Sequence, residues 1–344
     1  HWFFALASPE PHYFNQAFCL KPRQPLNAAL LAQALDCLGH HHDALRLRFQ
    51  TLADGGWEQR YAALDTPVIR FTEVDLRPLP EAGRMAQQTG ILDQLQRGFD
   101  LQHGPLAAAI LAHGWTAGEQ RLLIAAHHLV VDVVSWRILL EDLESAYLTL
   151  DRGQTPALPP RTAAYAEWGA ALQRYAQSPA LAEIQPYWAQ LSENPPRLKR
   201  DREAPLPALR DTATLTLRLP AVHSAPLLEK PFGLYRARAN DVLLTALTLA
   251  IFRWSGARDW RLDLEGHGRE EEIGQLDVSR TVGWFTSLFP VRLRLPETVD
   301  PDSNPAALVR ALLAIKETLR GIPGNGLSYG ILRYLGRGIL DSPD

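Results

Sequence analysis

The chain has little cysteine and no long apolar segment. Only Cys19 and Cys37 occur among its 344 residues, which is too few for a disulfide framework or for a zinc site built from cysteines. No apolar run reaches the ~18 residues that a membrane-spanning helix needs, and the chain does not open with a signal peptide. These absences favour a reducing, cytoplasmic setting without membrane contact.

The chain also lacks an excess of charge of either sign. Its 35 Lys and Arg residues nearly balance 38 Asp and Glu residues, for a net charge of −3. No basic stripe with interleaved aromatic residues recurs, so we expect no nucleic-acid partner. The hydrophobic share of 46% is typical of a globular protein. Because the first residue is His1 and Trp2-Phe3-Phe4 already resembles core, we expect a piece of a longer polypeptide.

The length favours two domains, at roughly 100–200 residues each, and the first half alternates helix and strand patterns. Asn27 can cap a helix whose apolar residues between Leu30 and Leu38 form one stripe. Apolar runs predict strands at 44–49, 67–74, 106–112 and 121–126, and helices at 81–95, 162–175 and 181–191. We therefore place a mixed α/β lobe at residues 1–191.

A connector follows the first lobe. Residues 192–211 combine four prolines with clustered charges, a composition suited to an exposed linker. Beyond it, the alternation over 213–219 predicts a half-buried strand, and the apolar pattern over 241–254 predicts a helix. Further strands are predicted at 260–264 and 288–295. A second mixed α/β lobe is thus expected at 212–344.

Two adjacent histidines stand between a strand pattern and a helix pattern. His127, His128 and Asp132 lie at this strand end, where a neutral imidazole with a pKa near 6.5 suits proton transfer. A purely structural histidine pair is the competing interpretation. Asp132 could orient a histidine, or pair with a buried arginine and hold the loop. We favour the structural role, with Arg46 and Arg137 as the nearest candidate partners by pattern.

A metal site is the obvious alternative, because His40-His41-His42 and His267 add to the histidine count. The spacing disfavours it, since no His-Glu-x-x-His helix occurs and adjacent histidines on a strand point to opposite faces. We expect residues 40–42 to form an exposed turn after a helix. No metal is therefore predicted.

A second candidate segment is 263–270, which follows a strand and contains Glu265 and two glycines. A lone carboxylate there would by default be a solvated loop acid. A glutamate and a histidine brought from two lobes into one crevice could instead transfer protons on opposite faces of one substrate atom.

Two further segments have a distinctive composition. Residues 279–291 hold an aromatic run before a strand, for which core packing of Phe285 or Phe289 is the plain explanation. Residues 323–330 form a glycine-rich turn. That turn lacks the preceding strand and the glycine spacing of a dinucleotide loop, so we do not interpret it as a phosphate site.

In this order and at these distances, the segments resemble the epimerization domains of nonribosomal peptide synthetases, a branch of the condensation-domain superfamily. The resemblance spans nearly the whole chain. Trp2-Phe3-Phe4 and Asn15-Gln16 are similar to the family's opening, and residues 127–139 resemble its His-His-x-x-x-Asp-Gly motif. Residues 265–270 discriminate further, because condensation domains that form peptide bonds do not usually carry this segment.

The resemblance implies an α/β fold of two chloramphenicol-acetyltransferase-like lobes in a V-shaped pseudo-dimer, with a central tunnel. Residues 281–291 would bridge the lobes beneath that tunnel. It also implies a peptidyl carrier protein domain as partner, beside neighbouring synthetase modules. The carrier would supply phosphopantetheine, and the domain itself would bind no cofactor.

The implied reaction is reversible L-to-D inversion at the α-carbon of a carrier-bound aminoacyl or peptidyl thioester, with His128 and Glu265 as catalytic residues. The resemblance also suggests a set of supporting residues and a set of candidates for the tunnel or the substrate arm. The supporting set is His127, Asp132, Arg46, Arg137, Ser135 and Trp136. The tunnel set is Gly266, His267, Arg269, Gly283, Trp284, Thr286, Ser287 and Tyr329.

The chain departs from the family pattern in three places. Val133 stands where the family has glycine, and it either strains the loop or has ordinary φ and ample room. Ser328 replaces a common glycine, and the family's Phe-Asn-Tyr-Leu-Gly element does not follow Gly330, so we expect an incomplete second lobe. Two alternatives remain: a condensation domain that joins two carrier-bound substrates, and a catalytically silent carrier-docking module.

Overall fold

The computed structural model describes residues 1–116, 118–192, 211–270, 273–299 and 305–336. The chain forms two compact units, and each unit combines two segments that are separate in the sequence. The first unit comprises His1–Tyr175 with Glu271–Thr286, and the second comprises Ala176–Glu270 with Ser287–Asp344. None of the described helices is long and apolar enough to cross a membrane.

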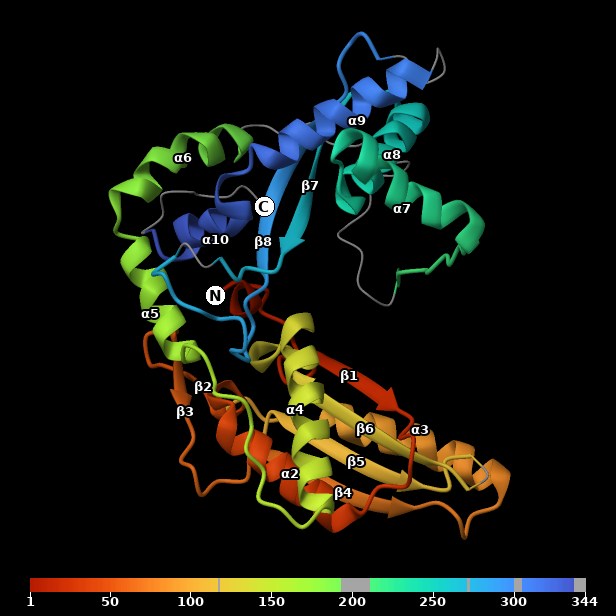
Figure 1. The fold of residues 1–344 in the computed structure, drawn as a ribbon. Coiled ribbons are helices and arrows are strands. Elements are labelled where there is room, and N and C mark those ends of the chain that lie inside the picture. The colour runs from red at the N-terminus through yellow and green to blue at the C-terminus, as the bar shows by residue number, and fades with distance from the viewer. Residues whose placement is uncertain (117, 193–210, 271–272, 300–304, 337–344) are drawn as a thin grey trace. The chain divides into compact units, whose positions relative to one another are not determined.

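A four-stranded sheet forms the centre of the first unit (Figure 1). Its strands, in spatial order, are β1 (Asn15–Leu20), β6 (Gln120–His127), β5 (Ala107–His113) and β4 (Ile69–Asp75). The β4–β5 pair is parallel and the other two pairs are antiparallel. Nearly every residue of β5 and β6 is buried, which explains why these strands appear in the sequence as continuous apolar runs.

Helices cover both faces of this sheet. α2 (Ala28–His41) and α4 (Val133–Asp151) pack on each other on one face, and α3 (Glu81–Arg97) lies on the other (Figure 1). The smaller elements of the unit surround this core. They are α1 (Trp2–Ala5), η1 (Asp43–Arg46), β2 (Leu47–Thr51), β3 (Trp57–Tyr61), η2 (His128–Val130) and α5 (Tyr165–Tyr175).

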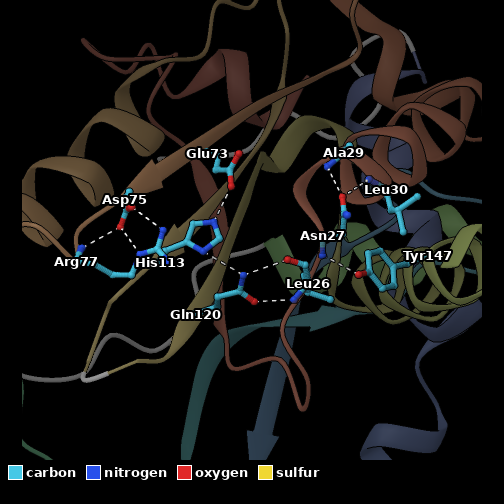
Figure 2. Close-up of polar contacts among 10 residues, drawn as sticks. All are labelled: Leu26, Asn27, Ala29, Leu30, Glu73, Asp75, Arg77, His113, Gln120 and Tyr147. Carbon is cyan, nitrogen blue, oxygen red and sulfur yellow. Dashed lines mark hydrogen bonds and ion pairs between the residues drawn. The ribbon is translucent and has the colours of Figure 1, made fainter.

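Asn27 begins α2 as predicted. Its side-chain oxygen accepts hydrogen bonds from the backbone N–H groups of Ala29 and Leu30, which would otherwise lack partners in the first helical turn. The Asn27 backbone N–H donates to the Tyr147 hydroxyl of α4, and Gln120 of β6 makes two hydrogen bonds to the Leu26 backbone (Figure 2). The cap therefore also fixes α2 to α4 and to the sheet.

The second unit contains a two-stranded antiparallel sheet of β7 (Asp259–Gly266) and β8 (Ser287–Arg294). α8 (Ala239–Ser255) packs on α9 (Pro305–Arg320), and α10 (Leu327–Tyr334) packs on β8. The remaining elements are α6 (Pro179–Ser192), α7 (Ala221–Tyr235) and η4 (Pro323–Gly326). Opposite one end of β8, Asp259 of β7 binds the guanidinium groups of Arg292 and Arg294.

The boundaries of the units differ from the predicted lobes of 1–191 and 212–344. α6 belongs to the second unit, because its fully buried Trp188 donates a hydrogen bond to Ser328 and packs against Phe289 and Tyr329. Residues 271–286 return to the first unit. Most of the predicted linker at 192–211 lies outside the described residues.

Two predicted strands need correction. Residues 213–219 form no strand, and Leu215 and Leu217 are 85% and 84% exposed. A strand needs a neighbour to satisfy its backbone, and within the described part of the second unit β7 and β8 pair only with each other. In the first unit, the predicted strand at 44–49 begins as the 3-10 turn η1, before β2 starts at Leu47.

Candidate active site

The two adjacent histidines lie where β6 ends and the backbone turns. His127 is the last residue of β6 and lies opposite Asn15 of β1. Its backbone N–H donates to Leu106, and the N–H of His128 donates to Phe14. His128 then begins the 3-10 turn η2. Because of this turn, the two imidazoles enter different surroundings.

His127 is a structural residue. Its side chain is fully buried, its Nε2 lies 2.9 Å from the carbonyl oxygen of Pro11, and its Nδ1 accepts from the Leu129 N–H at 3.2 Å. A carbonyl oxygen only accepts, so Nε2 carries the proton of a neutral ring. Burial lowers the pKa of His127 to about 4, because the charged form would lose its hydration. The ring therefore stays neutral and holds the strand end.

His128 has different surroundings from those of His127. Its half-buried ring stacks on Phe14 at a centroid distance of 5.3 Å and lies 4.8 Å from the ring of Trp284. Its Nε2 is 2.9 Å from the side-chain nitrogen of Gln16. Its Nδ1 is buried and has no hydrogen-bond partner among the described residues. Nε2 thus makes a hydrogen bond to the Gln16 amide, whereas Nδ1 makes none to the described residues.

Asp132 has the structural role favoured from the sequence. It is 3% exposed, and its carboxylate accepts from the Ser135 N–H at 2.6 Å, which caps α4. The second carboxylate oxygen accepts from the Phe285 N–H at 3.2 Å. The expected arginine partners were wrong, because Arg46 donates to the Ala62 carbonyl and Arg137 pairs with Glu141 on the surface. Two backbone N–H groups, those of Ser135 and Phe285, bind this carboxylate.

Ser135 fixes the aromatic segment 281–286 to the start of α4. Its hydroxyl donates to the Gly283 carbonyl at 2.8 Å and accepts from the Gly283 N–H at 3.0 Å. The Tyr165 hydroxyl donates to the Trp284 carbonyl at 2.8 Å. Gly283 has a φ of 157°, and a Cβ there would overlap the Tyr165 ring, so glycine is needed at this close approach. These contacts hold Trp284 beside His128.

Val133 does not strain the loop. It is the first residue of α4 and 77% exposed, and it is not among the residues with positive φ. A β-branched side chain is acceptable at such a helical, open position. Of the two interpretations left open by the sequence, ordinary φ with ample room is correct.

Glu265 lies on the second unit, within β7 and not after it. It pairs with Leu288 of β8 and is exposed. The next residue, Gly266, packs so closely that a Cβ would lie 2.7 Å from the Ser287 hydroxyl. That hydroxyl is buried and has no hydrogen-bond partner among the described residues. The carboxylate is therefore presented by a regular strand with a tight glycine contact beside it.

The other tunnel candidates of the second unit lie around the end of β7. His267 is exposed, and its Nδ1 accepts from the Arg269 N–H at 3.0 Å. Glu270 accepts from the Asn325 side chain at 2.8 Å, which ties this loop to η4. Tyr329 lies on α10 with its ring 5.3 Å from that of Trp188. Thr286, half-buried, ends the segment that belongs to the first unit.

The structure thus gathers the predicted residues into two sets. In the first unit, His127, His128, Asp132, Ser135, Trp136, Gly283 and Trp284 surround the start of α4, whereas Arg46 and Arg137 lie elsewhere. Gln16 is the member of this set that the residue pattern alone did not assign. It entered the sequence analysis only as part of the similarity to the family's opening, because an isolated glutamine carries no spacing signal.

The histidine run at 40–42 is not an exposed turn. His40 and His41 end α2, while His42 is 3% exposed. The Nε2 of His42 lies 2.9 Å from the Asp142 carboxylate, which also accepts from Arg280 at 2.5 Å. The donor atoms of His41, His42 and Asp142 lie within 4.8 Å of one another. A metal ion there would have to compete with the guanidinium of Arg280 for the same carboxylate.

A surface cavity of about 350 Å³ lies at the opposite end of the sheet, where β6 begins. Lys21 and Glu119 on its rim form an ion pair. Arg77 binds Asp75, and the His113 ring lies between Glu73 and Gln120 (Figure 2). The eight residues of β6 separate this end of the sheet from His127, a span of roughly 25 Å. The cavity is therefore distinct from the surroundings of His128.

The chain is similar to known proteins over nearly its whole length. The family model for the condensation domain matches residues 1–337. The chain belongs to the condensation-domain family. Over 97% of its length, this condensation-family domain is 43% identical to one of the proteins that form the linear gramicidin synthase of Brevibacillus parabrevis. It is 39% identical, over the same share, to part of the mycosubtilin synthase of Bacillus subtilis. It spans only 4% and 12% of these two proteins.

Two solved structures resemble this chain to different degrees. The epimerization domain from the third module of tyrocidine synthetase B is 36% identical with a TM-score of 0.88, over 97% of this chain and 74% of that one. The first condensation domain of the calcium-dependent antibiotic synthetase is 22% identical with a TM-score of 0.72, over 99% and 76%. At that identity the likeness shows the fold alone. The predicted mixed α/β fold of the chloramphenicol-acetyltransferase type is confirmed, and the V shape and the tunnel stay predictions.

Proposed function

We propose that this domain epimerizes the α-carbon of an aminoacyl or peptidyl thioester on a carrier protein, reversibly between L and D, in nonribosomal peptide synthesis. The observation that carries the proposal is the 36% identity and TM-score of 0.88 to an epimerization domain, against 22% and 0.72 to a condensation domain. The segment 265–270, which condensation domains do not usually carry, supports the same branch.

A thioester makes this chemistry feasible for ordinary side chains. Removal of the α-proton leaves charge on the carbonyl oxygen, so a modest base suffices where donors stabilise that oxygen. We assign the two proton-transfer roles to His128 and Glu265, without assigning a face of the substrate to either. The role of His128 is supported by its half-buried position between the rings of Phe14 and Trp284. The role of Glu265 is supported by its exposed side chain.

The proposed partner is a peptidyl carrier protein domain that presents its substrate on phosphopantetheine, within a chain of neighbouring synthetase modules. The support is that the curated relatives belong to peptide synthases, and that this domain spans only a small part of each. No cofactor bound by the domain itself is proposed. The cytoplasm is the proposed location, because two cysteines are too few for the disulfide framework typical of small secreted domains.

The test is exchange of the α-proton for solvent deuterium on a loaded carrier, read by mass spectrometry and chiral analysis. The wild-type domain should scramble an L-aminoacyl thioester. Glu265→Gln and His128→Gln should each lower the rate of exchange by roughly 10²- to 10⁴-fold, the usual contribution of a general acid or base. Asp263→Asn, on the same strand and also exposed, and the exposed His103→Gln are matched controls that should keep the wild-type rate.

Full exchange in Glu265→Gln would remove that residue from the chemistry. A wild-type domain that leaves a single carrier-bound substrate unchanged, yet joins two loaded carriers, would instead establish condensation. Carrier binding with neither reaction would establish a silent docking module. The number of loaded carriers required separates epimerization from condensation, and binding without either reaction identifies the docking module.

A further inference from the structure

A chain of two hydrogen bonds connects Trp136 to His128 through Gln16. The indole nitrogen of Trp136 lies 2.9 Å from Oε1 of Gln16, and Nε2 of Gln16 lies 2.9 Å from Nε2 of His128. The three residues come from α4, β1 and the turn η2. Gln16 is half-buried on β1, opposite Ala126 of β6. The chain therefore lies wholly within the first unit.

The direction of both hydrogen bonds follows from the chemistry of the three groups. An indole N–H can only donate, so the oxygen of the Gln16 carboxamide must face Trp136. The NH₂ group of Gln16, which can only donate, then faces His128. Nε2 of His128 must accept this hydrogen bond, so it carries a lone pair. The ring is neutral, and its single proton lies on Nδ1.

Trp136 is well placed to keep the amide in this orientation. It is 3% exposed, and its ring packs edge-on against Phe18 of β1 at a centroid distance of 5.0 Å. Reversal of the Gln16 amide would place its NH₂ group against the indole N–H, so that two donors would face each other. Trp136 thereby influences the tautomer of His128 through Gln16.

We infer that Gln16 is a positioning residue, which holds His128 as the neutral tautomer with its proton on Nδ1 and its lone pair on Nε2. His127, its neighbour, carries its proton on the opposite nitrogen, because its Nε2 faces the Pro11 carbonyl. The distinction between the two histidines of the motif is therefore made by their hydrogen-bond partners.

The consequence for catalysis rests on the proposed function. The α-carbon–hydrogen bond breaks, the proton goes to the lone pair on Nε2 of His128, and the electron pair moves into the thioester enolate. The second proton-transfer group, assigned above to Glu265, returns a proton to the opposite face of the carbon. Because that lone pair accepts from the N–H of Gln16, this hydrogen bond must break before the proton is taken up. Gln16 therefore holds the resting base neutral, and re-formation of the hydrogen bond favours its return to that form.

Long-range ¹H–¹⁵N NMR of the ¹⁵N-histidine-labelled domain tests the tautomer directly, with the His128 signals assigned by their loss in His128→Gln. The wild-type domain should show a protonated Nδ1 and an unprotonated Nε2. Gln16→Glu should protonate Nε2, since a carboxylate accepts from both Trp136 and His128. Trp136→Phe should give a mixture of tautomers, because the amide is then free to reverse. Gln24→Glu introduces the same charge in the exposed loop after β1 and should leave the spectrum unchanged.

Kinetics supply the second readout. Gln16→Glu should lower kcat for α-proton exchange by roughly 10- to 100-fold with little change in KM, a fraction of the usual contribution of a general base. A protonated Nε2 in the wild-type domain, or a tautomer unchanged by Gln16→Glu, would overturn the inference. An absence of exchange in the wild-type domain together with the expected spectra would refute the proposed function and leave the role of Gln16 intact.

Discussion

Acid should destabilise the first unit through His127. The ring is fully buried and neutral, with both nitrogens in hydrogen bonds that require one proton on Nε2 and none on Nδ1. Burial lowers its pKa from 6.5 to about 4. Below pH 6.5 the unfolded chain therefore binds a proton that the folded chain does not bind until about pH 4. Free energy of unfolding is lost across that window as pH falls, and above it His127 makes no pH-dependent contribution.

The magnitude follows from the difference between the two pKa values. A depression from 6.5 to about 4 corresponds to about 3 kcal/mol at 1.36 kcal/mol per pKa unit. The loss approaches about 1.4 kcal/mol per pH unit in the middle of the window. This is a large part of the 5–15 kcal/mol that typically stabilises a folded domain. The contribution of His127 to the pH dependence of the free energy of unfolding should therefore be measurable beside the contributions of the other histidines and the carboxylates.

Urea unfolding between pH 4 and pH 8 measures the effect as a difference between variants. His127→Gln keeps an amide donor for the Pro11 carbonyl but cannot titrate, so its stability should fall by about 3 kcal/mol less than wild type over the window. The exposed His223→Gln should follow the wild-type curve. Parallel curves for wild type and His127→Gln would show that the ring is hydrated or partnered differently, and would refute the argument.

Two further predictions concern the start of α4. Asp132→Asn should lower the free energy of unfolding by about 1–3 kcal/mol, because an amide NH₂ would face either the Ser135 or the Phe285 N–H. Chemical denaturation checks this against the exposed Asp151→Asn, and equal stabilities would contradict it. Val133→Gly should leave the exchange rate unchanged and cost no more than about 0.5 kcal/mol at this open helical position. A faster variant would mean that the valine obstructs the reaction.

Local sequence patterns predicted correctly the strands that are buried along their length and the helix that is capped by a residue adjacent in sequence. The apolar runs of β5 and β6 and the capping side chain of Asn27 are found where the sequence indicates. The alternation over 213–219 predicted a strand wrongly, because alternation says which side chains share a face and not whether another strand lies beside them. The sequence pattern of 213–219 does not reveal whether another strand is available to pair with it.

The site was predictable only in part, for the same reason. His127, His128 and Asp132 are close in sequence, and their position at a strand end followed from the pattern. His42 and Asp142 are 100 residues apart, and Gln16 and His128 are 112 apart. No sequence motif predicts a contact between residues that are so far apart in the sequence. The buried histidine at 42 therefore resembled an exposed turn in the sequence.

The difference between His127 and His128 shows that a motif of two adjacent histidines does not determine the tautomer of either ring. Both are imidazoles at one strand end, yet His127 donates from Nε2 to a carbonyl while His128 accepts there from an amide. Exchange of the two partners would exchange the tautomers, with no change in the His-His spacing. The tautomers of the two rings are thus set by Pro11, in the segment before β1, and by Gln16, near the start of β1. A substitution at Gln16 should therefore alter His128 while the motif itself stays intact.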